Sequence, residues 1–173
     1  METIVINLIA GPCSGKSTIA SGIFYELKRR DINCELSLEF AKNMIYDESF
    51  KMMDDQIYLF AKQYHKLWSL RNKVNVIITD APLPMSLIYM KEPSEYFGKL
   101  ILEQYNKFNN WMFFIERSEE YQQEGRTQTK EESIALDEQI KQMLVDNHIE
   151  YSSVKQKDAV LLITDLILSK LKQ

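Results

Sequence analysis

The chain has 173 residues, of which 45% are hydrophobic, and it carries a net charge of -4 at pH 7. This length supports one hydrophobic core, so we expect a single domain spanning residues 1–173. The negative charge argues against an extended nucleic-acid surface, while two cysteines and the absence of a basic leader or a long apolar run predict a cytoplasmic protein that does not span a membrane.

The first half of the chain alternates between strand and helix patterns. Residues Thr3–Ala10 form an apolar, β-branched run that is typical of a strand buried on both faces, and we expect it at the centre of a sheet. Helical spacing begins at Gly15, and residues Cys34–Leu38 predict a second strand. The helix after this strand should bury an apolar stripe formed by Met53, Ile57, Phe60, Tyr64 and Leu67.

The second half continues the alternation. Further strands are predicted at Val74–Thr79, Trp111–Ile115 and Ile149–Val154. A polar loop at 116–129 is interpreted as a lid, and a helix capped by Thr129 and Glu132 should follow it. The last helix is expected to bury Ala159, Leu162, Ile163, Leu166, Ile167 and Leu171. The predicted fold class is therefore α/β, with a five-stranded parallel sheet and helices on both faces.

A phosphate-binding motif joins the first strand to the first helix. Residues Ala10–Thr18 match the P-loop pattern, except that Ala10 replaces its first glycine. In such a turn, backbone N–H groups, the helix N-terminus and the Lys16 ammonium converge on nucleotide phosphates, and Ser17 offers its hydroxyl to Mg²⁺. The motif predicts a P-loop NTPase sandwich that binds ATP through Gly11, Pro12, Cys13, Ser14, Gly15, Lys16, Ser17 and Thr18.

Acidic residues follow two of the predicted strands. Asp80 comes after the third strand, where it can hold magnesium together with Ser17 or accept a proton from a substrate hydroxyl. Glu39 ends the second strand at the same edge, where it can contact a sugar, and Gln56 is a second candidate substrate contact. The simpler alternatives are a helix cap for Asp80 and a solvated acid for Glu39.

Two arginines lie in the predicted lid. Arg117 and Arg126 are expected to cover the phosphates and to stabilise the charge that develops when a phosphoryl group is transferred. Together with Lys16 and Asp80 they form the candidate catalytic set. The alternative for each arginine is an ordinary surface role in a polar loop.

With the P-loop, Glu39, Asp80 and Arg126, the chain resembles small P-loop nucleoside and nucleotide kinases over nearly its whole length. It is most similar to the nicotinamide ribonucleoside kinase domain of bacterial NAD-biosynthesis regulators and to related small ATPases often encoded by phages. Besides the P-loop, the similar segments are 39–42, 77–80, 124–126 and 147–151. Lys42 departs from the pattern, because that family has an arginine three residues after the equivalent of Glu39.

The resemblance implies a P-loop strand at the centre of a five-stranded sheet, a lid over ATP and an acceptor pocket between Glu39 and Asp80. It also implies that Lys16 bridges phosphates while Ser17 and Asp80 hold magnesium.

Three functions stay open at this point. The first is a kinase that phosphorylates a nucleoside, a nucleotide or nicotinamide riboside. The second is a nucleotide-binding ATPase that acts through a protein partner, and the third is a polynucleotide 5′-end kinase. The preference for ATP over GTP and the identity of the acceptor are open too, because both depend on pocket shape. Tyr89 and Tyr96 are expected to be exposed and would permit a homodimer interface.

Overall fold

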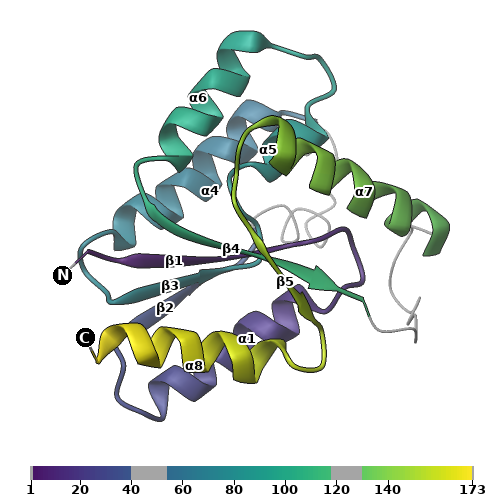
Figure 1. The fold of residues 1–173 in the computed structure, drawn as a ribbon. Helices are drawn as coiled ribbons and strands as arrows, with labels where there is room; N and C mark the ends of the chain where they lie inside the picture. Colours follow the sequence, from purple (N-terminus) through teal and green to yellow (C-terminus); the bar gives the residue numbers. More distant parts are fainter. Residues whose placement is uncertain (1, 40–53, 118–129, 173) are drawn as a thin grey trace.

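The computed structural model describes residues 2–39, 54–117 and 130–172. Its central layer is a parallel five-stranded sheet with the order β2-β3-β1-β4-β5. The strands are β1 (Ile4–Ile9), β2 (Cys34–Ser37), β3 (Val76–Thr79), β4 (Asn109–Glu116) and β5 (Ser152–Lys155). Because β1 lies between β3 and β4, the central position expected for the P-loop strand is confirmed (Figure 1).

The burial of β1 explains this position. All six of its residues are buried, and Ile6 pairs with Ile78 of β3 on one side and with Trp111 of β4 on the other. A strand that has neighbours on both edges and helices on both faces is expected to be largely apolar. Strand β1 is apolar except at Asn7, whose side chain donates hydrogen bonds to Val5 and Asn110. The turn that follows β1 therefore leaves the sheet from its most rigid part.

Helices cover both faces of the sheet (Figure 1). One face carries α1 (Lys16–Lys28) and α8 (Ala159–Leu171), which pack against each other. The other carries α4 (Gln56–Leu70), α5 (Met85–Tyr89), α6 (Glu95–Tyr105) and α7 (Lys130–Asp146). The predicted three-layer α/β architecture is confirmed. Among the helices of the described residues, none is long and apolar enough to cross a membrane.

Several predicted strand boundaries differ from the structure. Strand β3 begins at Val76 and not at Val74, and β4 begins at Asn109 and not at Trp111. Residues 149–151 precede β5, which runs from Ser152 to Lys155 because these residues pair with Phe113 to Glu116 of β4. Glu116 belongs to β4 and not to the predicted loop. Arg117 is described, whereas residues 118–129 of that loop, which include the capping residue Thr129, and the stripe residue Met53 lie outside the described residues.

Three residues predicted to be buried are exposed. Ile57 is 65% exposed because it lies in the first turn of α4, beyond the edge of the core, whereas Phe60 and Leu67 of the same stripe are buried. Leu162 and Leu166 are 49% and 48% exposed. Helix α8 packs inward through Ala159, Ile163 and Ile167. Since this helix is apolar on nearly every side, its sequence pattern alone does not identify the buried side.

Neighbouring residues of α8 provide a test of this orientation. Replacing buried Ile163 by alanine should lower the free energy of unfolding by about 2–5 kcal/mol, because it leaves a cavity. The matched variant Leu162→Ala should lower it by less than about 1 kcal/mol. Urea denaturation of both variants measures the difference, and equal losses would contradict the described orientation.

Candidate functional site

The P-loop turn leaves β1 and enters α1 through two left-handed backbone positions. Cys13 has a φ of 66° and Gly15 a φ of 79°. A Cβ atom on Gly15 would also lie 2.6 Å from the side-chain nitrogen of Gln156, which would have to move, so the left-handed conformation is what favours glycine there. Helix α1 begins without a side-chain cap, which leaves its first N–H groups available to an anion.

Lys16 lies folded over the turn. Its Nζ donates hydrogen bonds to the carbonyl oxygens of Ala10 and Gly11, each at 2.8 Å. Burial lowers the pKa of Lys16 to about 8, although the nearby carboxylates of Glu39 and Asp80 act in the opposite direction. The ammonium is therefore held at the position of the turn where a phosphate group would need it.

Asp80 connects three elements at the carboxyl edge of the sheet. Its side chain is buried, and Oδ2 accepts a hydrogen bond from the Ser17 hydroxyl at 2.5 Å. Its Oδ1 accepts from the backbone N–H of Glu39 at 2.8 Å. A hydroxyl and a carboxylate in this arrangement are hard oxygen ligands that fit Mg²⁺, which commonly takes one or two carboxylates and completes its shell with phosphates and water.

A second cluster forms around Glu39, whose backbone N–H is bound by Asp80 and whose charge also acts on Lys16. Lys66 of α4 donates to the carbonyl oxygen of Leu38 at 2.8 Å. Burial lowers the pKa of Lys66, while the charges of Asp80 and Glu39 raise it. Tyr89, although 42% exposed as a residue, has its pKa raised to about 12 by partial burial of the phenol and, to a smaller extent, by the charge of Glu39. The cluster thus offers a cation, a carboxylate and a phenol.

The neighbouring ends of β2 and β3 are held by Gln63 of α4. Its amide nitrogen donates to the hydroxyls of Ser37 and Thr79, each at 3.2 Å. These two residues immediately precede the segments that carry Glu39 and Asp80. Helix α4 therefore fixes the edge of the sheet on which both carboxylates lie, and Gln56 begins this helix two turns before Gln63.

Arg117 and Asp137 form a buried ion pair against the P-loop. Arg117 Nε lies 2.5 Å from Asp137 Oδ2, and the two side chains are 12% and 10% exposed. Asp137 Oδ1 accepts the Gly11 N–H at 2.6 Å, while the guanidinium also donates to the carbonyl oxygens of Pro12 and Ser133. Because the Gly11 N–H points at Asp137, it is directed away from any phosphate in this arrangement.

The family model for an AAA domain matches residues 5–159 of the chain, which run from β1 to the first residue of α8. The chain belongs to this AAA domain family. The matched residues include the P-loop, Asp80 and the Arg117–Asp137 pair.

Three solved structures share the fold of this AAA domain. The NadR protein in complex with NR has a TM-score of 0.67 and 18% identity over 94% of the chain, and the chain spans 52% of that protein. Thymidylate kinase from Ehrlichia chaffeensis has a TM-score of 0.62 and 12% identity, and 96% of the chain covers all of that protein. Deoxyadenosine kinase from M. mycoides with bound dATP has a TM-score of 0.54 and 18% identity, with 98% of the chain covering all of it.

These similarities confirm the α/β P-loop fold and the predicted resemblance to small P-loop kinases. A search of curated proteins finds no match to the chain. Among the three solved structures, the chain spans about half the length of the NadR chain and the full length of both kinases.

A cavity of about 330 Å³ adjoins the outer side of the P-loop in this AAA domain. It lies between the first turn of α1 and the start of α8, and its polar groups come from Thr18, Gln156 and Lys157. Ile19 and Val160 supply apolar surface. A cavity with apolar surface and few polar groups, beside an open helix N-terminus, suits a heterocyclic base whose phosphates lie in the turn.

The structure brings together most of the residues that the sequence singled out. Ser17, Lys16, Glu39 and Asp80 meet at one edge of the sheet, and Arg117 reaches the P-loop backbone. Arg126 lies outside the described residues. Within the described residues, no group of three or more His, Cys, Asp or Glu side chains could hold a metal ion. A cation at Ser17 and Asp80 would therefore depend on ligands from the nucleotide.

Sequence reasoning missed Lys66, Gln63, Gln156 and Asp137. Asp137 left a signal, because the spacing of Ser133, Asp137, Ile140 and Leu144 places a carboxylate on the buried face of α7. A charged residue at such a position needs a partner. The other three left no comparable pattern in the sequence.

The buried ion pair leads to a stability prediction. Asp137→Asn should lower the free energy of unfolding by about 3–5 kcal/mol, because it leaves the Arg117 guanidinium buried without its counter-charge. A double variant with Arg117→Met should lose less than the sum of the two single losses. The control is Glu95→Gln, which breaks an exposed pair with Lys99 and should cost less than about 1 kcal/mol. Additive losses in urea denaturation would contradict the direct pairing of Arg117 and Asp137.

Proposed function

We propose that the chain is an ATP-dependent phosphotransferase that moves the γ-phosphate to a small nucleoside, nucleotide or nicotinamide riboside. The observation that carries the proposal is the 2.5 Å hydrogen bond between Ser17 and Asp80. It joins the hydroxyl that follows the P-loop lysine to a carboxylate at the end of the neighbouring strand. Phosphoryl transfer depends on positioning and on charge stabilisation, and these are the groups it requires.

The related structures support the same proposal. Two of them are a thymidylate kinase and a deoxyadenosine kinase, and the third is NadR in complex with NR. The fold that they share places the groups of our chain at the carboxyl ends of β1, β2 and β3, where open α/β sheets bind their ligands. The cluster of Glu39, Lys66 and Tyr89 is the proposed acceptor side.

In the proposed mechanism, Lys16 exchanges the carbonyl oxygens of Ala10 and Gly11 for phosphate oxygens of ATP, and the first N–H groups of α1 bind the same phosphates. Magnesium, held by Ser17 and Asp80, would neutralise charge on the transferred group. Asp80 also faces the acceptor side, so it can accept the proton of the attacking hydroxyl.

The two arginines have different proposed roles. Arg117 has its nitrogens engaged with Asp137 and with the carbonyl oxygens of Pro12 and Ser133, so we propose that it acts on catalysis by holding the turn in shape. Arg126 is proposed to contact the phosphates directly, as predicted from the sequence.

The base of the nucleotide is proposed to occupy the cavity beside Gln156. Its amide has both donor and acceptor groups, which can pair with the polar edge of a purine such as adenine. We propose ATP as the phosphate donor.

The proposal also includes a cytoplasmic location and a homodimeric state for the enzyme. Cys13 and Cys34 are free thiols, and burial raises the pKa of Cys34 to about 11, which suits a structural cysteine in the reducing cytoplasm. Tyr89 and Tyr96 are 42% and 84% exposed, so both are available for the proposed homodimer.

The proposal is tested by offering labelled ATP and Mg²⁺ to nucleosides, nucleoside monophosphates, nicotinamide riboside and 5′-hydroxyl oligonucleotides. Label should pass to a small acceptor, and Lys16→Ala and Asp80→Asn should each slow transfer by about 10²-fold or more while the proteins remain folded. Lys170→Ala, on the exposed surface of α8, serves as the control.

Two other outcomes would replace the proposed small-molecule kinase by a different function. Release of inorganic phosphate alone, at a rate that no acceptor changes, would replace the kinase with an ATPase that acts through a partner. Labelling of the oligonucleotide, with binding that weakens steeply as salt rises, would identify a polynucleotide 5′-end kinase.

The buried ammonium predicts a pH dependence of ATP binding. Phosphate contact should raise the pKa of Lys16 above its value of about 8 in the free protein, because the anion stabilises the charged form. Binding should therefore take up a proton above pH 8 and weaken as the pH rises further. Calorimetry at pH 9 in buffers of different ionisation enthalpy measures this uptake. Lys16→Arg stays protonated and should show none; uptake that persists in this variant would exclude Lys16 as its source.

A further inference from the structure

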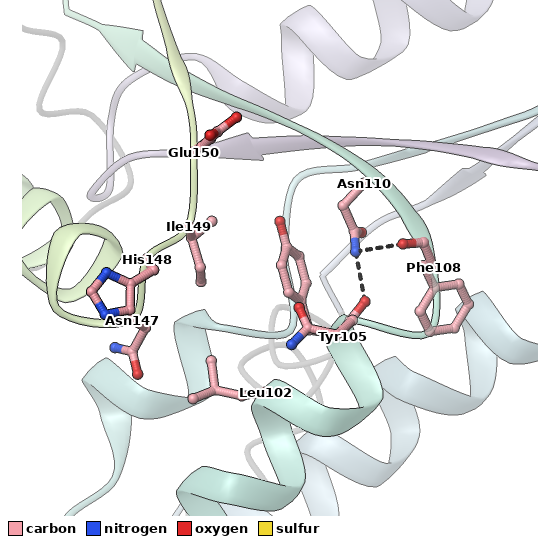
Figure 2. A pocket seen from close by; sticks show the side chains of 9 residues that line it. Leu102, Tyr105, Phe108, Asn110, Asn147, His148, Ile149 and Glu150 are labelled. Carbon is pink, nitrogen blue, oxygen red and sulfur yellow. Dashed lines mark hydrogen bonds between the residues drawn. The ribbon is translucent and has the colours of Figure 1, made fainter.

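A second cavity lies at the opposite edge of the sheet from the P-loop (Figure 2). It has a volume of about 440 Å³ and opens between the end of α6, the start of β4 and the connection from α7 to β5. Because the strands are parallel, their amino ends all lie on one side of the sheet, and the cavity is on that side. The candidate active site lies at their carboxyl ends. The cavity is therefore separate from the residues of the proposed kinase site.

The Tyr105 side chain forms the centre of the cavity wall. It is only 6% exposed, and among the described residues its hydroxyl has no hydrogen-bond partner. Figure 2 shows the phenol standing between Ile149 and Asn110 with its oxygen directed into the space. Burial raises the pKa of Tyr105 to about 12, so the group is a neutral donor and acceptor. The hydroxyl is not one of the fully buried polar atoms that lack a partner, so it reaches solvent at the cavity, where a ligand can hydrogen-bond to it in place of water.

The neighbouring amides are fixed before any ligand arrives. Asn110 donates to the carbonyl oxygens of Tyr105 and Phe108 at 2.6 and 3.1 Å and accepts from Asn7 at 3.0 Å. Asn147 donates to the carbonyl oxygen of Met143 at 2.7 Å. This donation uses one of the two hydrogens of the Asn147 nitrogen and leaves the other hydrogen and the side-chain oxygen for a ligand at the cavity. The walls thus have a defined shape and hydrogen-bonding pattern.

The chemistry of the lining selects a class of ligand. No lysine or arginine is among the lining residues, and Glu150 adds a carboxylate, so a phosphate group would be repelled. Leu102 and Ile149 offer apolar surface to a flat ring, while the Tyr105 hydroxyl and the Asn147 amide offer hydrogen bonds. The volume falls in the range of small-molecule sites. These features together suit a nucleoside that carries no phosphate.

Two elements connect this cavity to the P-loop. Strand β4 begins at the cavity, where Asn110 lies. Arg117 directly follows the last residue of this strand, about 23 Å from Asn110. Helix α7 ends just before Asn147 at the cavity, and carries Asp137 about 15 Å back along its axis. The ion pair that holds Gly11 therefore joins the residue that follows β4 to the middle of α7, and both elements also wall the cavity.

We propose that this cavity is a regulatory site for a non-phosphorylated nucleoside, and that a nucleoside bound there changes the affinity of the P-loop for ATP. The ligand lies between β4 and the connection that follows α7, so it biases the relative position of these two elements. That position determines the fit of Arg117 and Asp137 against the P-loop turn. The proposal rests on nucleotide binding by the P-loop, and it does not depend on phosphoryl transfer to any acceptor.

The first test titrates adenosine, guanosine, cytidine and uridine into ¹⁵N-labelled protein. At least one nucleoside should shift the amide signals of residues 102–110 and 147–150. Tyr105→Phe should weaken this binding about threefold to tenfold through loss of one hydrogen bond, and Asn106→Trp at the exposed rim should abolish it. Tyr96→Phe, on the same helix but 84% exposed, is the matched control and should change nothing.

The second test measures the coupling. The nucleoside should change the dissociation constant of Mg·ATP, and Mg·ATP should change that of the nucleoside by the same factor, because binding linkage is reciprocal. Both effects should disappear in Asn106→Trp, whereas ATP binding without nucleoside should remain.

Four results would overturn the proposal. These are shifts confined to residues near Glu39 and Asp80, absence of nucleoside binding up to millimolar concentration, tighter cavity binding by the matching nucleoside monophosphate, and cavity binding that leaves ATP affinity unchanged. The first of these would be binding at the acceptor side, and it would leave the proposed kinase function intact.

Discussion

The hydrogen bond between Ser17 and Asp80 is the contact on which the candidate site depends. It exists because β3 lies directly beside β1, so that the segments leaving the two strands meet at one edge of the sheet. The same carboxylate accepts the Glu39 N–H, which brings the end of β2 to the same point. Three chain segments that are distant in sequence are thus joined through one buried side chain, with its two oxygens used by different partners.

The P-loop is held from both sides of the turn. Lys16 bonds to carbonyl oxygens of the turn from within, while Arg117 and Asp137 bind the backbone of Gly11 and Pro12 from outside. A nucleotide would have to draw Lys16 away from its carbonyl partners, but it would leave the outer contacts in place. We therefore expect nucleotide binding to move the Lys16 side chain while the backbone of the P-loop turn keeps its shape.

Residues at strand ends could be predicted from the sequence, and residues brought in by helix packing could not. Glu39 and Asp80 follow apolar runs that predict parallel strands, so their proximity follows from the topology. Lys66 and Gln63 reach the same region from α4, whose orientation depends on side-chain packing against the sheet. Gln156 directly follows β5, and it was missed although it lies at a strand end. The same limit explains α8, where leucines cover so much of the helix that Leu162 and Leu166 were expected in the core and are exposed.

The measurement that tests the central claim most directly is a crystal structure with Mg²⁺ and a non-hydrolysable ATP analogue. The account predicts that Lys16 has left the carbonyl oxygens of Ala10 and Gly11 for the phosphates, with the metal ion beside Ser17 and Asp80 and the base next to Gln156. A nucleotide bound elsewhere, or one bound while Lys16 stays on the turn and Ser17 stays on Asp80, would contradict it.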